Sequence, residues 1–140
     1  MFIKQLSIFV ENKQGRLGAI VSALAKDGVN IRALSLADTT NFGVLRLIVD
    51  DTVKAKKALD SVGVIAKTTD VIAVYVDDCA GALDSMLALL TEGGVEIEYM
   101  YAFVSKLCGK ALMVVKADDE EKAEKILTEG GMKTADKSEI

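Results

Sequence analysis

The sequence predicts an α+β protein built from two copies of one small βαββαβ module, with antiparallel sheets paired side by side and helices on one face. Three observations predict it: a chain length that suits two small modules, an internal repeat, and the same succession of strand-like and helix-like spacing in each copy. The chain has 140 residues, and we place the modules at residues 1–69 and 70–140. A module of this size buries only about 60% of its unfolded surface, so we expect each to pack against the other or against a further copy.

The internal repeat appears when the chain is shifted by 66 positions. The matches fall on glycines and apolar residues, the positions that fix turns and cores: Gly15 on Gly81, Leu17 on Leu83, Leu24 on Leu90, Gly28 on Gly94, Val29 on Val95, Ile31 on Ile97, Gly43 on Gly109 and Val49 on Val115. Past residue 50 the best shift becomes 68, which places Leu59 on Leu127 and Gly63 on Gly131. We therefore expect two extra residues near the second helix of copy two.

The first copy begins with a partly alternating strand over residues 3–10, followed by a polar loop that ends at Gly15. Leu17, Ile20, Val21 and Leu24 then recur with the spacing of one helix face. Gly28 ends that helix, because glycine readily adopts the left-handed cap conformation. The remaining predicted elements are strands at 30–37, 42–49 and 64–69, a turn at 38–41 and a weaker helix at 53–62.

The second copy repeats this succession. Its predicted elements are strands at 71–76, 96–104 and 110–116, a turn at 106–109, helices around 83–90 and 123–127, and a short last strand after Gly131. The order strand–helix–strand–strand–helix–strand is the ferredoxin-like plan, whose helices cover one face of an antiparallel sheet. Thr69-Asp70 is the expected break between the copies; without a linker the modules must touch, and strand exchange between them is possible.

Composition argues against several classes of function. The net charge of −4 disfavours nucleic acid and anionic membranes as partners. No apolar run is long enough to span a bilayer, and the N-terminus does not resemble a signal peptide, so we expect a cytoplasmic protein. The absence of histidine removes the commonest general base and metal ligand. We therefore expect a binding protein rather than an enzyme, with no cofactor and no metal.

Several modules use the ferredoxin-like plan, and local features separate them. The predicted third strands lack the aromatic platform of RNA-recognition modules. Cys79 stands alone in the first loop of copy two, where metal-carrying relatives have two cysteines. Cys79 and Cys108 are too few for a disulfide framework. They are read as ordinary small residues, and a redox pair at one end of the module is left open.

Residues 11–31, ENKQGRLGAIVSALAKDGVNI, resemble the ACT domain, the amino-acid-sensing module of many metabolic enzymes. The match consists of a loop glycine, an apolar residue two places on, about a dozen helical residues and Gly-Val-Asn-Ile. Copy one has Gln14 where the family often has proline. Copy two fits more weakly, with Ala80 at the proline position and Glu96 in place of the asparagine. The resemblance implies a tandem ACT protein that binds an amino acid.

The first loop is physically suited to a carboxylate. A helix that starts near Gly15 and Arg16 leaves its first N–H groups unpaired and carries a partial positive charge there. A glycine at the turn allows the backbone to approach a bound group closely. Asn12, or a loop carbonyl, would then hold the ammonium group of the ligand.

The resemblance implies that the ligand lies between paired ACT domains and contacts the loop asparagine of one domain and the asparagine opening the second strand of the other. In this chain both asparagines belong to copy one, as Asn12 and Asn30. If the two copies pair with each other, Asn12 would face Glu96, which stands in copy two where copy one has Asn30. Glu96 favours a ligand with an exposed amine or a basic side chain. Asp78 would repel a carboxylate unless it holds the ammonium, so we prefer the Asn12 loop. The candidate ligand-binding residues are Asn12, Lys13, Gln14, Gly15, Arg16, Leu17, Asn30, Ile31, Asp78, Cys79, Ala80, Gly81, Leu83 and Glu96.

Simpler roles remain open for these residues. The glycines can serve only as turn and cap residues, and Asn30 can simply close the turn after the helix. Tyr99, Tyr101 and Phe103 alternate along one strand with Ile97. We expect them on the open face, because Met100 and Ala102 between them align with Leu34 and Leu36, which look buried. Such a stripe suggests a homodimer that buries sheet faces.

Two functions are therefore weighed. The first is a regulatory protein that binds a free amino acid or similar small carboxylate and is read by a metabolic enzyme. The alternative is a ligand-free module for dimerisation or protein interaction.

Overall fold

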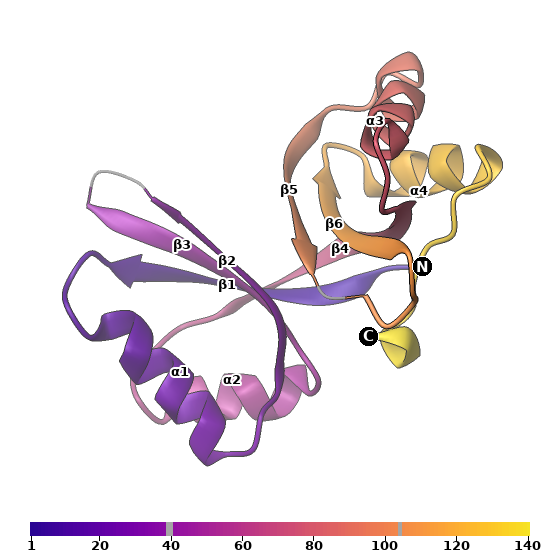
Figure 1. Ribbon diagram of the computed structural model, residues 1–140. Coiled ribbons are helices and arrows are strands. Elements are labelled where there is room, and N and C mark those ends of the chain that lie inside the picture. Colours follow the sequence, from indigo (N-terminus) through magenta and orange to yellow (C-terminus); the bar gives the residue numbers. More distant parts are fainter. Residues whose placement is uncertain (39–40, 104) are drawn as a thin grey trace. The chain divides into compact units, whose positions relative to one another are not determined.

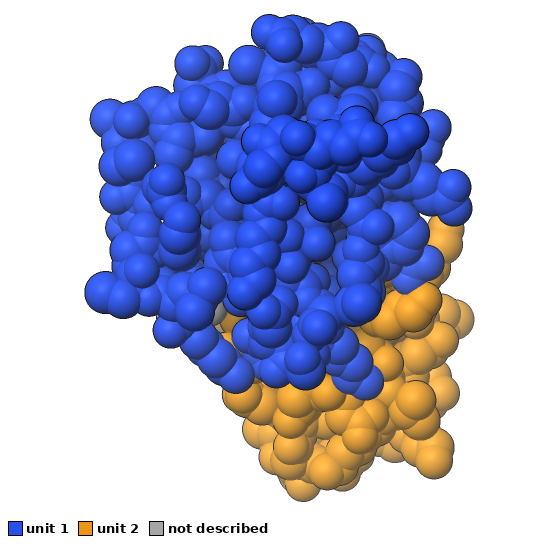
Figure 2. All heavy atoms as spheres, turned by 90° about the vertical axis from the view of Figure 1, so that its right-hand side faces the viewer, with its two compact units in different colours: residues 1–3, 70–140 blue, residues 4–69 orange. Residues whose placement is uncertain are grey.

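A computed structural model describes residues 1–38, 41–103 and 105–140 of the chain. Thr39 and Thr40 of the predicted turn, and Val104 at the end of a predicted strand, lie outside the described residues. The chain forms two compact units, residues 4–69 and residues 1–3 together with 70–140 (Figure 2). Among the helices of the described residues, none is both long enough and apolar enough to cross a membrane.

Up to its second helix, the unit of residues 4–69 follows the predicted order of elements (Figure 1). Its elements are β1 (Ile3–Glu11), α1 (Arg16–Lys26), β2 (Ile31–Asp38), β3 (Phe42–Val49) and α2 (Thr52–Asp60). The strands pair antiparallel in the order β2-β3-β1. Alternate residues of β1 and β3 form the core with both helices, and Leu6, Leu24, Leu45, Leu47 and Leu59 lie at its centre. This confirms the helix-on-sheet plan, although Val21 of the predicted helix face is partly exposed.

The second unit has the same plan. It contains β4 (Lys67–Asp77), α3 (Ala82–Glu92), β5 (Ile97–Phe103), β6 (Lys110–Ala117), α4 (Glu120–Glu129) and a short 3-10 helix, η1 (Lys137–Glu139). The strand order is β4-β6-β5, again antiparallel. Ile72, Val74, Met86, Leu90 and Leu127 lie in its core. Phe2 packs against this core from the opposite end of the chain, so the first residues belong to the second unit.

Three predicted strands differ in the structure: those at 64–69 and 71–76 form one strand that begins at Lys67, and the last strand is shortened. The expected break at Thr69-Asp70 is absent, because β4 runs without interruption from Lys67 to Asp77. This segment contains no glycine or proline, and its β-branched residues favour extended backbone. The predicted last strand after Gly131 is reduced to an isolated bridge between Val74 and Thr134.

The strand register also moves the predicted insertion. Leu6 pairs with Leu47 in copy one, and its counterpart Ile72 pairs with Val115 in copy two. Val115 therefore corresponds to Leu47 and not to Val49, as a shift of 66 had suggested. The shift of 68 already applies in the third strand, so the two extra residues lie in the β5–β6 hairpin and not near the second helix. The match of Gly43 with Gly109 was coincidental.

The aromatic residues of β5 lie on the predicted face but are not an exposed stripe. Met100 pairs with core residue Val115, which places Tyr99, Tyr101 and Phe103 on the other face. Phe103 is only 8% exposed, and the two tyrosines are partly buried. A bulge between Ile97 and Tyr99 turns Ile97 toward the core instead.

Leu34 and Leu36, which were expected to be buried, are 52% and 48% exposed. They lie on β2, an edge strand of the sheet. The aromatic residues therefore give no support to a dimer that buries sheet faces.

Candidate ligand-binding site

The first loops of the two units have the same backbone geometry. Gly15 and Gly81 precede α1 and α3 with φ values of +86° and +90°. In copy one Lys13 N–H donates to the Glu11 carbonyl at 2.8 Å, and in copy two the Cys79 N–H donates to Asp77 at 2.9 Å. No side chain caps the first turn of either helix in the described residues. The first helical N–H, of Arg16 and of Ala82, donates to a loop carbonyl at 3.3 Å in both copies. The positive end of each helix dipole nevertheless lies at the loop, which favours a carboxylate there.

The side chains on these loops differ. In copy one Lys13 and Glu11 form an ion pair at 3.1 Å, and the hydrogen bond from Lys13 holds the pKa of Glu11 below its usual value. In copy two Asp77 pairs with Lys110. The predicted loop residues Asn12 to Arg16 and Asp78 to Gly81 are all exposed, Leu17 is partly buried, and Leu83 is exposed on α3. The loops are therefore similar frameworks that carry different chemistry.

The second predicted half of the site lies where α1 and α3 end. Gly28 and Gly94 adopt φ values of +70° and +74°. The next residue bonds back into the helix in both copies, from Val29 N–H to Leu24 and from Val95 N–H to Leu90. This is the Schellman arrangement, which ends the helix and directs the chain into the next strand.

Two aspartates hold the residues that follow, and sequence reasoning missed both. Asn30 N–H donates to Asp50 Oδ1 at 3.0 Å, and Glu96 N–H donates to Asp118 Oδ1 at 3.1 Å. The aspartate N–H groups return the bond, to the carbonyls of Asn30 and Glu96. Asn30 does close this turn, but through its backbone, since Glu96 makes the same bonds. Its exposed side chain is not needed for the turn.

A repeated sequence signal could have found this corner. The pattern Asp-Asp-x-x-Lys follows the third strand in both copies, at residues 50–54 and 118–122. The second aspartate caps the next helix by accepting from the lysine N–H, as Asp119 does from Lys122 at 3.0 Å. The ammonium group of Lys122 lies 3.6 Å from the position that a Cβ would take on Gly94. The lysine thus places a positive charge beside the end of α3.

The structure does not bring the two predicted halves together within a unit. Asn12 precedes α1 and Asn30 follows it, and an 11-residue helix is about 16 Å long. The same separation applies to Asp78 and Glu96 on either side of α3.

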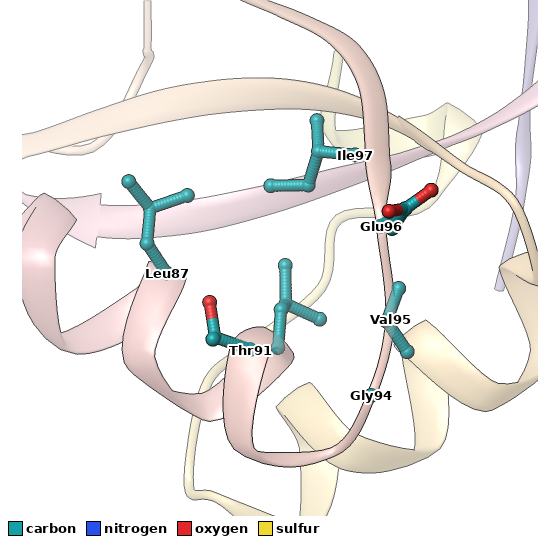
Figure 3. A pocket seen from close by; sticks show the side chains of 7 residues that line it. Leu87, Thr91, Gly94, Val95, Glu96 and Ile97 are labelled. Carbon is teal, nitrogen blue, oxygen red and sulfur yellow. The ribbon is translucent and has the colours of Figure 1, made fainter.

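A groove in the second unit opens beside Glu96 (Figure 3). It has a volume of about 740 Å³ and is lined by Leu87, Leu90, Thr91, Gly94, Val95, Glu96 and Ile97. Figure 3 shows Leu87 and Thr91 on α3 and Ile97 at the start of β5 around the same hollow. The lining combines apolar residues with two polar ones, Thr91 and Glu96. Of these residues only Glu96 was predicted as a site residue.

A smaller cavity of about 290 Å³ lies beside the first loop of the second unit. Tyr75 lines it, and burial raises the pKa of its hydroxyl. Lys133 lies over the Tyr75 ring, 5.4 Å from its centre, and pairs with Glu139 at 3.1 Å. Lys110, also in the lining, pairs with Asp77. Since its charged groups already have partners, this cavity suits a charged ligand less well than the groove. The described residues contain no cluster suited to a metal ion.

Comparison with known proteins identifies the family to which this fold belongs. The family described as an ACT domain pair matches residues 1–139. Protein BT0572 from Bacteroides thetaiotaomicron is 39% identical, with a TM-score of 0.92, and the alignment covers 99% of this chain and 95% of that one. No curated protein matches the chain.

Two more distant structures share the fold. The regulatory subunit of aspartate kinase from Thermus thermophilus, in its ligand-free form, has 16% identity and a TM-score of 0.65, with 91% of each chain covered. The Thermus flavus counterpart has 16% identity and a TM-score of 0.63, over 91% of this chain and 92% of that one. With the family match over nearly its whole length, the chain belongs to the ACT domain family and is an ACT domain pair.

Proposed function

We propose that this protein is a regulatory protein that binds a free amino acid or a similar small carboxylate. The observation that carries the proposal is the groove at Glu96, which combines an apolar lining with one acidic group at the strand start. The groove volume of about 740 Å³ is within the usual range for small-molecule sites. The ferredoxin-like fold by itself would not support this function, because many unrelated functions use it.

The ligand amine would bind Glu96, and an apolar part of the ligand would lie against Leu87, Val95 and Ile97. A carboxylate would then bind the uncapped N-terminus of α1 in a neighbouring ACT module, next to Asn12 and Gly15. The exposed Asn30 and the acidic loop around Asp78 would form the other combination. We propose that the ligand binds to the combination of the Asn12 loop with Glu96. There the positive end of α1 would face the ligand carboxylate, and the Glu96 carboxylate would face the ligand amine.

The regulatory part of the proposal is supported by similarity in fold to aspartate kinase regulatory subunits. Binding at a junction of two modules would stabilise one arrangement of them, and a partner that distinguishes the arrangements would respond. We propose a homodimer as the working form and a metabolic enzyme as the regulated partner.

A thermal-shift screen against the twenty amino acids tests this function. An amino acid at one hundred times its dissociation constant should stabilise the folded chain by about 2.7 kcal/mol. Glu96→Gln should reduce that shift, and Lys54→Met, at the equivalent corner of copy one, serves as a matched surface control that should not. If none of the twenty raises the melting temperature, the ligand-binding function is wrong. The chain would then be better explained as an interaction module.

A further inference from the structure

The two cysteines of the chain lie at the same end of the second unit. Both are exposed and free. Cys79 belongs to the first loop, between β4 and α3, and Cys108 belongs to the β5–β6 hairpin. The register of β4 and β6 ends with Asp77 opposite Lys110. One residue further on, Asp78 N–H donates to the Gly109 carbonyl at 2.9 Å.

We propose that Cys79 and Cys108 are a disulfide-forming pair, which ties the first loop of the second unit to its hairpin when oxidised. Cys79 directly follows Asp78, and Cys108 directly precedes Gly109, so each cysteine lies one residue beyond the last hydrogen bond between the two segments. Residues directly opposite each other in an antiparallel pair have Cα atoms about 4.5–5.5 Å apart, and the turns carry the two cysteines on from such a pair. A disulfide requires a Cα separation of about 4.4–6.8 Å.

The backbone around both residues is turn and not strand. The Cys79 N–H donates to the Asp77 carbonyl at 2.9 Å, and Lys110 N–H donates to Leu107 at 3.3 Å. Gly109, with a φ of +73°, lies inside the second turn. Loops adjust more readily than paired strands, so the thiols can reach bonding geometry without breaking the β4–β6 ladder.

The pair is confined to copy two. The position equivalent to Cys79 is Lys13, which in copy one forms the ion pair with Glu11. Cys108 lies in the hairpin that carries the two extra residues of copy two, as the strand registers show. Copy two thus differs from copy one at both places: a cysteine replaces the loop lysine, and the longer hairpin contains the second cysteine.

The chemistry is thiol–disulfide exchange with a low-molecular-weight disulfide, RSSR. One cysteine thiolate attacks a sulfur of RSSR, and RS⁻ leaves, which gives a mixed disulfide. The second thiolate attacks the cysteine sulfur of that mixed disulfide, the Cys79–Cys108 bond forms, and a second RS⁻ leaves. The two cysteines are oxidised, RSSR is reduced to two thiols, and the two thiol protons pass to the RS⁻ groups.

The link would restrain the loop around Asp78, which the proposed binding site does not use, so the pair does not depend on the proposed function. It is tested without any ligand. The full chain is incubated with glutathione disulfide and, separately, with a phosphine reductant, and then alkylated and digested with trypsin without reduction. Trypsin leaves Cys79 in the peptide 68–106 and Cys108 in the peptide 107–110.

The expected result is a disulfide that joins these two peptides within a monomeric chain, and its loss on reduction. The oxidised chain should melt roughly 5–10 °C above the reduced one, since the bond closes a loop in the unfolded state. Cys79→Ser and Cys108→Ser should each give only a mixed disulfide with glutathione and no rise in melting temperature.

Three outcomes would overturn the proposal. One is a wild-type chain that carries two glutathione adducts and no link between the peptides. Another is a link found only between two chains, seen as a dimer on a non-reducing gel. The third is an internal link that leaves the melting temperature unchanged or lowers it, because the thiols would then meet only in a distorted chain.

Discussion

Replacing Asp118 with alanine should loosen the start of β5 by an amount that the structure allows us to calculate. Its Oδ1 accepts the Glu96 N–H at 3.1 Å and the Asp119 N–H at 2.9 Å. The corner is exposed, so water replaces part of what is lost, and each bond contributes about 0.5–1.5 kcal/mol net. We expect Asp118→Ala to lower the free energy of unfolding by about 1–2 kcal/mol. Asp118→Asn keeps an acceptor oxygen and should lower it by less.

Urea unfolding followed by far-ultraviolet circular dichroism measures the loss of stability, and hydrogen exchange of the Glu96 amide measures it locally. A loss of about 1.4 kcal/mol at that bond corresponds to roughly tenfold faster exchange. Asp50→Ala should have the same effect on the Asn30 amide, because the bonds repeat while the side chains differ. Equal exchange at Glu96 in Asp118→Ala and Asp118→Asn would refute the reasoning, as would an unaffected Asn30 in Asp50→Ala.

Three further predictions concern stability. Gly15→Ala should lower the melting temperature, because alanine at φ +86° costs about 1–2 kcal/mol. Gly18→Ala should raise it, because Gly18 lies inside α1 with open space around it. Equal shifts in the two variants would contradict this. Leu90→Ala should cost about 2–5 kcal/mol in a denaturant titration, because the side chain is fully buried in the second core, and a loss under 1 kcal/mol would argue against that packing. Burial raises the pKa of Glu120 above its usual value of 4.5, so the folded state binds the carboxyl proton more tightly than the unfolded state does. The free energy of unfolding should therefore fall as pH rises from 4.5 through the raised pKa. Glu120→Gln should flatten that part of the pH profile.

The helices were predictable because local signals agree. Apolar spacing and the glycines at positions 15, 28, 81 and 94 define α1 and α3 on their own. The predicted break between two strands at Thr69-Asp70 was wrong, because nothing in that stretch ends a strand. Leu34 and Leu36 looked buried because they alternate correctly, but alternation does not reveal that β2 is an edge strand.

The candidate site was predictable only in part. Asn12, Asn30 and Glu96 came from loop position and family resemblance, whereas Leu87 and Thr91 enter the groove only when α3 packs beside β5. Asp118 and its counterpart escaped notice because they act on backbone groups twenty or more residues away. The two extra residues were predicted near the second helix because Gly43 matches Gly109 at a shift of 66. Only the strand register shows that they lie in the β5–β6 hairpin.

The measurement that tests the central claim most directly is a calorimetric titration of the chain with the amino acid that gives the largest thermal shift. If only the combination of the Asn12 loop with Glu96 binds ligand, the titration should give about one ligand per chain. The affinity of Glu96→Gln should be at least tenfold weaker, since a hydrogen bond to a charged group contributes about 1.5–3 kcal/mol. Asn30→Ala should leave that affinity nearly unchanged. Two equal sites per chain, or full affinity in Glu96→Gln, would contradict the account.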